Sequence, residues 1–228
     1  MKNYFCFYNA GLAGTWLTWF INQHASFPQY KMSDNTTDNV VTDLTCLGST
    51  WCYMADDEDG CSDDALTFDQ YVSDVTVKYS QNNSATKRCI KVLPDHDLSD
   101  LDSTSDLFTE VMNKIDYIIM PTLLPDSPMS HLIERRVAFM WGDADQRHQE
   151  MIEIYADVTN GVYDTKFNKP MHYLQIDKLL NGNEAEYNAL LDIIEESPID
   201  NWAQIAADYR INFIEKDYGK LNDRTVFK

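Results

Sequence analysis

Four short, mostly apolar runs, the first ended by a turn and the next two by a proline, constrain the fold of this chain more than any other feature. The runs are residues 4–8, 88–93, 116–120 and 172–176. Runs of this length that are apolar throughout are typical of strands in a parallel sheet covered on both faces. They alternate with segments of helical periodicity. The alternation predicts one α/β domain over residues 1–228, a three-layer arrangement in which helices flank a short parallel sheet.

The helical segments have apolar residues that recur every three or four positions. In the first of them Trp16, Leu17, Phe20 and Ile21 share one face, and the pattern ends near Pro28. The same spacing predicts further helices after each later strand. The expected helices are residues 15–24, 103–114, 130–141, 145–158, 184–196 and 200–217.

Charge excludes two classes of partner. The chain has 18 basic and 37 acidic residues, a formal charge of −19, which opposes nonspecific binding to nucleic acid or to an anionic membrane surface. The N-terminus lacks the pattern of a signal peptide, and no apolar run reaches the length of a membrane helix. Five cysteines without a C-x-x-C pair favour a reducing compartment, with a disulfide conceivable only among Cys46, Cys52 and Cys61. We therefore expect a cytoplasmic protein.

The acidic residues are concentrated in one third of the chain. Residues 34–106 contain 16 acidic and four basic side chains, and residues 34–84 resemble an insertion between the first two strands. Its densest part, residues 56–64, has the composition of a calcium loop. Its carboxylates are consecutive, however, and no Glu closes the loop, which favours a solvated acidic loop. His131 and Glu134 share a helical face without a second ligand pair, so we expect no metal site.

The turn after the first strand has the composition of an anion site. Residues 9–15 contain Gly11, Gly14 and Thr15, directly before a helix whose N-terminal amides attract anions. Neither of the common nucleotide fingerprints is present, because the turn has no Lys and no G-x-G-x-x-G. The alternative interpretation is that the glycines serve only the backbone geometry of a tight turn.

Residues 7–17, Phe-Tyr-Asn-Ala-Gly-Leu-Ala-Gly-Thr-Trp-Leu, resemble the opening of the sulfotransferase family. There a strand leads into a P-K-S-G-T-T-W-L loop that holds the 5′-phosphosulfate of the donor PAPS. The family's Lys falls on Gly11 and its Pro on Ala10, so the loop cation is missing. The resemblance implies a P-loop-type sulfotransferase fold, with PAPS as the nucleotide donor. The implied donor-binding residues of this turn are Gly11, Leu12, Ala13, Gly14, Thr15 and Trp16.

A second partial match follows the third strand. The family has R-x-P-x-D-x-x-x-S, whose Arg and Ser hold the 3′-phosphate, and Asp126 and Ser130 fall on this pattern. Thr122 stands at the Arg position. The resemblance makes Arg135 and Arg136, further along the same helix, the alternative cations. Residues 172–180 resemble the family's late strand, which ends in Y-E-D-L-L and is followed by terminal helices.

The resemblance also suggests a base and a cation. Sulfotransferases deprotonate the acceptor hydroxyl with a His or a carboxylate near the end of an early strand, and His96 lies between Asp95 and Asp97 after the second strand. Its ordinary pKa suits a base near neutral pH. The alternative is an exposed His on a capped loop. Lys91 is the candidate to replace the loop Lys, if the strand alternation points it toward the turn.

Two functions remain open from the sequence. The first is a PAPS-dependent sulfotransferase that acts on an unidentified hydroxyl acceptor through positioning and charge stabilisation. The second is a catalytically inactive relative with a structural or interaction role. Because the chain looks like divergent sulfotransferase-like proteins of marine phages, its partners would then be phage proteins or copies of itself. Its location would be the host cytoplasm or the virion.

Overall fold

A computed structural model describes residues 1–8, 12–29, 81–92, 112–125, 127–132, 144–211 and 214–215. Of the expected features, the acidic segment up to residue 80 and the three cysteines within it lie outside these ranges.

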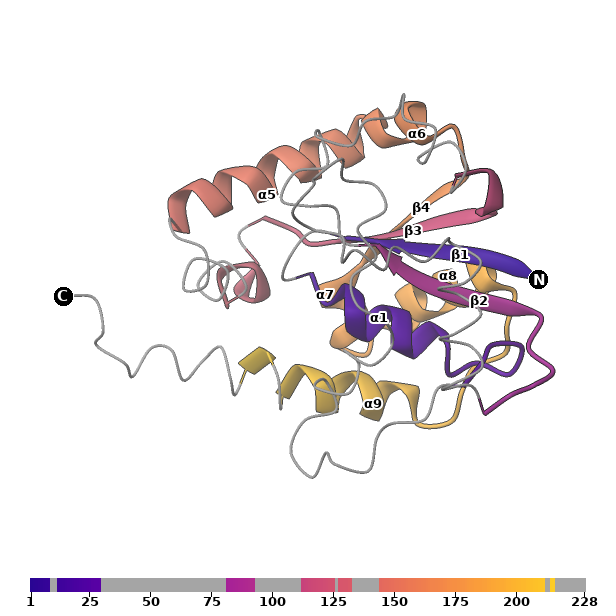
Figure 1. Cartoon of the computed structure of the whole chain (residues 1–228). Helices are drawn as coiled ribbons and strands as arrows, with labels where there is room; N and C mark the ends of the chain where they lie inside the picture. The colour runs from indigo at the N-terminus through magenta and orange to yellow at the C-terminus, as the bar shows by residue number, and fades with distance from the viewer. Residues whose placement is uncertain are drawn as a thin grey trace, which may run out of the picture. The chain divides into compact units, whose positions relative to one another are not determined.

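The centre of the structure is a four-stranded, all-parallel sheet with flanking helices (Figure 1). The spatial order of the strands is β2-β1-β3-β4. Strand β1 pairs with β2 along its whole length, from Lys2 opposite Lys87 to Phe7 opposite Val92, and with β3 from Tyr4 opposite Tyr117 to Cys6 opposite Ile119. The strands are β1 Lys2–Phe7, β2 Lys87–Val92, β3 Tyr117–Thr122 and β4 Met171–Gln175. The predicted α/β class and all four predicted strands are confirmed.

Strand β3 continues through Pro121 to Thr122, whereas the sequence predicted that Pro121 would end it. A proline is excluded from a strand when its missing N–H is needed by a neighbour. The pairing of β3 with β1 ends at Ile119, so the sheet tolerates a proline two residues later.

The helices are α1 Gly14–Ile21, α5 Ala144–Thr159, α6 Val162–Phe167, α7 Ile176–Leu180, α8 Glu184–Ile194 and α9 Trp202–Tyr209. Four of the predicted helices correspond to α1, α5, α8 and α9, with ends that differ by several residues. Helices α6 and α7 were not predicted, because six and five residues are too few to establish a periodicity. Of the other two predicted helices, only residues 112–114 and 128–132 are described, and these are helical. No described helix has the length and apolar character needed to cross a membrane.

The chain divides into two compact units, and the division passes through β3 and β4. Unit 1 comprises Met1–Asn9, Gly14–Met120 and Asp164–His172. Unit 2 comprises Ala10–Ala13, Pro121–Tyr163 and Tyr173–Lys228.

The core of unit 1 forms where helix α1 packs against β1 and β2 (Figure 1). The α1 residues Trp16, Leu17, Phe20 and Ile21 are all fully buried, as the helical spacing predicted. The rings of Trp16 and Phe20 stack with 4.8 Å between their centroids. Burial of large side chains of this kind contributes about 1.5–3 kcal/mol each, so α1 is held mainly by its contact with the sheet.

A buried amide completes the backbone hydrogen bonding of β2. Asn22, just after α1, donates from Nδ2 to the carbonyl of Cys89 at 2.8 Å, and the amide of Cys89 donates to Asn22 Oδ1 at 3.0 Å. Both groups of Cys89 are therefore satisfied by a side chain. This arrangement links the end of α1 to the strand, which would otherwise bury two unpaired polar groups.

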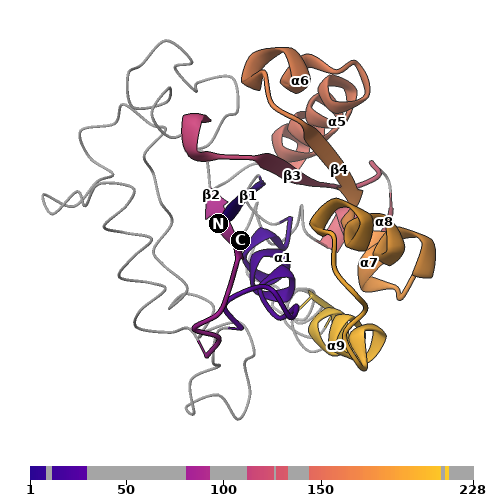
Figure 2. The same cartoon turned by 90° about the vertical axis from the view of Figure 1, so that its right-hand side faces the viewer.

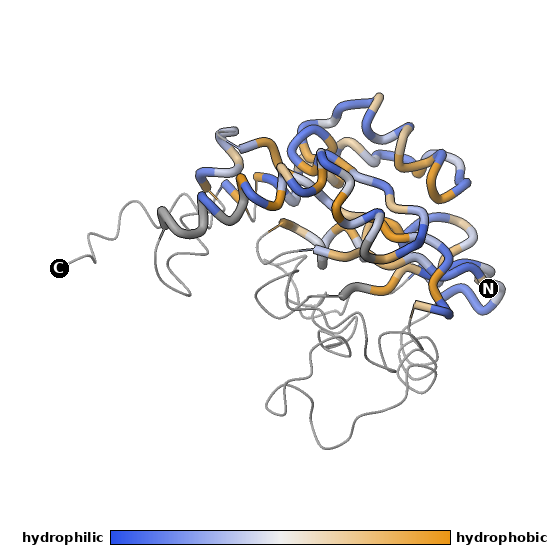
Figure 3. Tube along the Cα trace, turned by 90° about the horizontal axis from the view of Figure 1, so that it is seen from above, coloured by the Kyte–Doolittle hydropathy of each residue, from blue (hydrophilic) through white to orange (hydrophobic). Residues whose placement is uncertain are grey.

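Unit 2 has its core among α7, α8 and α9, which lie side by side (Figure 2). The ring of Tyr187 on α8 stacks on that of Trp202 at the start of α9, with 4.1 Å between the centroids. Hydrophobic and hydrophilic residues are interspersed along the described helices (Figure 3), and in α7, α8 and α9 the buried side chains are all hydrophobic. The buried side chains are Ile176, Leu179, Leu180, Tyr187, Leu190, Leu191, Ile194, Ala206 and Tyr209.

Candidate functional site

The order of the strands indicates where a ligand would bind. From β1 the chain continues to β2 on one side, whereas from β3 it continues to β4 on the other. In parallel sheets, ligands bind beyond the carboxyl ends of two neighbouring strands whose connections leave in opposite directions. Ala10–Ala13, which follow β1, and residues from Pro121 onward, which include the last two residues of β3 and the segment after it, belong to the same compact unit. They are the segments that the sequence analysis selected.

The turn after β1 is tight and apolar in its described part. Leu12 is buried, and Ala13 adopts a left-handed backbone with φ 56°, a conformation in which a non-glycine residue is uncommon. Gly14 then begins α1. Gly11, the residue at the family's Lys position, lies outside the described residues.

The ring of Tyr8 lies against Gly14. A Cβ atom at position 14 would be 1.9 Å from Cγ of Tyr8 and 2.0 Å from its Cδ1. Since no side chain fits at such distances, position 14 requires glycine while Tyr8 stays where it is. This accounts for a Gly where the sulfotransferase pattern has its first Thr, and it means that a Thr hydroxyl has no equivalent there.

The carbonyl oxygen of Gly14 accepts hydrogen bonds from two side chains of the protein. It accepts a hydrogen bond from Thr18 Oγ1 at 2.8 Å and one from the thiol of Cys6 at 3.6 Å. Trp16, expected among the donor-binding residues, has no exposed surface and is a core residue. Thr15 is the second residue of α1, and its side chain is not among those described.

After β3, the hydroxyl groups are used within the protein. Ser130, the candidate ligand of a 3′-phosphate, is fully buried and donates from Oγ to the carbonyl of Ser127 at 2.7 Å, while its amide donates to Ser127 Oγ at 3.0 Å. This reciprocal pair satisfies the start of the helix at residues 128–132. Thr122, at the family's Arg position, is buried and donates from Oγ1 to the carbonyl of Leu174 at 3.3 Å.

The remaining candidates are not brought together within the described residues. His96, Asp126, Arg135 and Arg136 lie outside them. The backbone of Lys91 is on β2, opposite Cys6 of β1, and its side chain is not described. The sulfotransferase assignment of these residues thus stays a prediction.

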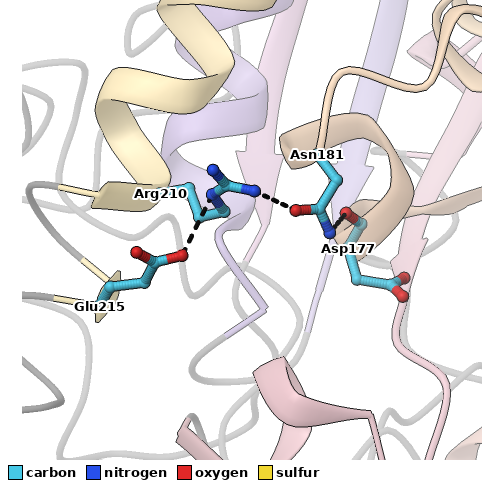
Figure 4. Close-up of polar contacts among 4 residues, drawn as sticks. All are labelled: Asp177, Asn181, Arg210 and Glu215. Atoms are coloured by element: carbon cyan, nitrogen blue, oxygen red, sulfur yellow. Dashed lines mark hydrogen bonds and ion pairs between the residues drawn. The ribbon is translucent and has the colours of Figure 1, made fainter.

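A polar cluster at the end of β4, which the sequence analysis did not select, lies within unit 2 (Figure 4). Arg210, after α9, donates from a terminal guanidinium nitrogen to Oδ1 of Asn181 and forms an ion pair with Glu215 at 3.2 Å. Nδ2 of Asn181 donates to the backbone carbonyl of Asp177 at 2.7 Å. The contact between Asn181 and Asp177 could have been found from the sequence, since residues four apart are neighbours on a helix. The partner from α9 is not adjacent in sequence.

The side chains of Gln175 and Asp177 carry buried acceptor atoms at this point. Oε1 of Gln175 and Oδ1 of Asp177 are inaccessible to solvent and have no hydrogen-bond partner in the described part of the chain. Burial raises the pKa of Asp177, an effect that backbone amides of Asp177 and Lys178 and the charge of Lys178 only partly oppose. The carboxyl group of Asp177 points away from Asn181 and Arg210 (Figure 4).

Two other titratable groups, in unit 1, have shifted pKa values. Burial raises the pKa of the Cys89 thiol well above its usual range, and the neighbouring Cys6 raises it further, so this thiol is a poor nucleophile. Burial lowers the pKa of His172, and the carboxylate of Asp164 partly opposes this shift. Cys89 lies in the middle of β2 and His172 lies near the start of β4. Neither is therefore at the carboxyl end of a strand, where a base for the transfer reaction is expected.

Among the described residues, no three His, Cys, Asp or Glu side chains are grouped closely enough to hold a metal ion. No protein-family model, no curated protein and no solved structure matches this chain.

Proposed function

We propose that the chain binds PAPS beyond the carboxyl ends of β1 and β3 and transfers its sulfuryl group to a hydroxyl acceptor. The observation that supports this proposal is the strand order β2-β1-β3-β4, in which the connections after β1 and β3 leave in opposite directions. The partial sulfotransferase motifs follow these same two strands at residues 7–17 and 122–130. The finer fold assignment, a three-layer P-loop-type sulfotransferase fold, is part of the proposal.

In the proposed reaction the acceptor oxygen attacks sulfur, and the bond from sulfur to the phosphate oxygen breaks. His96 takes the proton of the acceptor hydroxyl, and PAP leaves with the negative charge. The backbone amides of the turn at residues 11–15 and a cation stabilise that charge as it develops. Lys91 is the proposed cation, and Arg135 and Arg136 are the proposed ligands of the 3′-phosphate.

The second candidate function is an inactive relative with a structural or interaction role. The packing of Tyr8 on Gly14 favours it, because the ring occupies the space in which the family places a hydroxyl side chain. The commitment of Ser130 Oγ to the carbonyl of Ser127 favours it as well. A binding measurement distinguishes the two candidate functions.

Calorimetric titration with PAP tests the proposal. We expect PAP to bind at micromolar to millimolar concentration and 5′-AMP, which lacks the 3′-phosphate, to bind more weakly. Arg135→Ala and Arg136→Ala together should weaken PAP binding by about tenfold or more, the value of a lost charged hydrogen bond. Arg147→Ala on α5 is the control for the loss of a single positive charge, at a position that belongs to neither partial motif. Absence of both heat and thermal shift at millimolar PAP would overturn the transfer function.

If PAP binds and His96→Ala abolishes transfer while leaving PAP binding intact, the base assignment is supported. If PAP binds but no transfer to water, alcohols or phenols occurs, the inactive relative is the better description. The two measurements thus separate nucleotide binding from chemistry.

A further inference from the structure

We propose that the junction of β4 and α7 is a binding site for a protonated amine, with Asp177 Oδ1 and Gln175 Oε1 as its acceptors. Both atoms are buried without a hydrogen-bond partner among the described residues. Buried acceptors in proteins almost always accept a hydrogen bond, and a buried acceptor without one costs about 1–3 kcal/mol. Two such atoms within three residues indicate that a donor from a ligand belongs there.

The side-chain donors of this cluster point to other acceptors, and the backbone amides of Asp177 and Lys178 only partly stabilise the Asp177 carboxylate. Arg210 is directed to Asn181 and Glu215, and the amide of Asn181 is directed to the backbone carbonyl of Asp177 (Figure 4). The backbone amide of Gln175 donates to Glu186 Oε1 at 2.6 Å. None of these groups supplies the missing hydrogen bonds.

The charge at the junction favours a cationic donor over a neutral one. The junction contains two carboxylates, those of Asp177 and Glu186. Glu186 lies there because it accepts the hydrogen bond of the Gln175 amide. The adjacent cation, Lys178, has an exposed side chain, and its effect on the pKa of Asp177 is smaller than that of burial. An ammonium group combines a positive charge with three donors, which suits a carboxylate and an amide oxygen together.

The location is consistent with a substrate site. Gln175 is the last residue of β4 and Asp177 is the second residue of α7, so both lie at the carboxyl end of a parallel strand, where ligands of such sheets bind. If the transfer function holds, the acceptor is a hydroxyl compound that also carries an amine. That assignment rests on the proposed function, whereas amine binding at the junction does not.

The test uses methylammonium and tetramethylammonium as probes, which have the same charge but differ in N–H donors. The full chain is titrated with each while NMR follows the carboxyl carbon of Asp177 and the side-chain amide of Gln175. We expect methylammonium to shift both signals saturably and to lower the pKa of Asp177, because a bound cation stabilises its charged form. Asp177→Asn and Gln175→Met should each weaken methylammonium binding, the former by about tenfold.

Asp192→Asn is the matched control, since it removes an exposed carboxylate of α8. Equal effects of the two probes, or equal weakening by Asp192→Asn and Asp177→Asn, would show general attraction of cations and overturn the site. A pKa of Asp177 below its ordinary range in the free protein would also overturn it, because an internal cation would then occupy the position. Thermal unfolding confirms that each variant is folded, and Gln175→Met remains a test if Asp177→Asn is not. Failure of PAP to bind would leave these results unaffected.

Discussion

The ring of Tyr8 fills the space that a side chain at position 14 would need, since a Cβ there would lie 1.9 Å from Cγ of Tyr8. Because Tyr8 is itself buried, it cannot move aside without losing its own packing. The identity of residue 14 is therefore decided by residue 8.

Gly14→Ala should destabilise the protein, although alanine is the better helix former. Helix propensity alone would favour alanine by about 1 kcal/mol, whereas overpacking costs about 1–3 kcal/mol or more. We expect the steric cost to win, and urea unfolding to show a lower midpoint. In the Tyr8→Ala background the same substitution should be neutral or stabilising. Equal effects in the two backgrounds would contradict the contact, since a double-mutant cycle must then show no coupling.

Asn22→Ala should be strongly destabilising, because it leaves the amide and carbonyl of Cys89 buried without partners. An unsatisfied buried group costs about 1–3 kcal/mol, so we expect a loss of about 2–5 kcal/mol in the free energy of unfolding. Gln23→Ala, which removes a half-buried amide next to it that donates at 3.3 Å to the carbonyl of Trp19, is the control and should cost far less. Similar losses for the two variants would argue against a special role for Asn22.

His172 should make the stability depend on pH near neutrality. Its pKa is lowered in the folded protein from 6.5 by burial, so between the folded and the unfolded pKa the unfolded chain binds more protons. Stability therefore rises with pH through this window, is complete above about pH 6.5 and is lost as the pH falls. His172→Gln should flatten the dependence measured by thermal unfolding between about pH 5 and 7. His131→Gln, which removes an exposed imidazole, should preserve it.

Tyr187→Phe should cost about 1 kcal/mol, because the hydroxyl of Tyr187 accepts a hydrogen bond from the amide of Ile199 at 2.9 Å. The ring would still stack on Trp202. Tyr187→Leu should cost about 3 kcal/mol or more, since the buried ring is lost as well. Denaturant unfolding of both variants separates the hydrogen bond from the stack. A Phe variant as unstable as the Leu variant would contradict this division.

The elements that could be predicted are those that show an apolar run or a helical period within their own consecutive residues. The four strands were found because each is a continuous apolar run, and α1, α5, α8 and α9 because their apolar residues repeat at the helical period. Helices α6 and α7 escaped because five or six residues make fewer than two turns. The extension of β3 past Pro121 was missed because it depends on where the neighbouring strand stops pairing.

For the candidate site, only the preceding strands could be predicted and checked. The turn at residues 11–15 and the segment near Ser130 follow β1 and β3 in sequence, and their role in binding stays a prediction. Which side chains are available to a ligand could not be predicted, because it depends on tertiary contacts. Ser130 Oγ donates to the carbonyl of Ser127, and Trp16 is buried in the core. The cluster of Asp177, Asn181 and Arg210 joins residues up to 33 positions apart, and sequence spacing contains no record of such a contact.

By itself the sequence determined the class of this protein, an α/β fold with a short parallel sheet, because period and breakers are local properties of the chain. It also determined the charge of −19. Only the tertiary structure decided the order β2-β1-β3-β4, the requirement for glycine beside Tyr8, and the two oxygens at the end of β4 that have no partner within the described part of the chain. Each of these depends on which distant segments pack together, and packing is set by shape and hydrogen bonding across the fold rather than by neighbours in sequence.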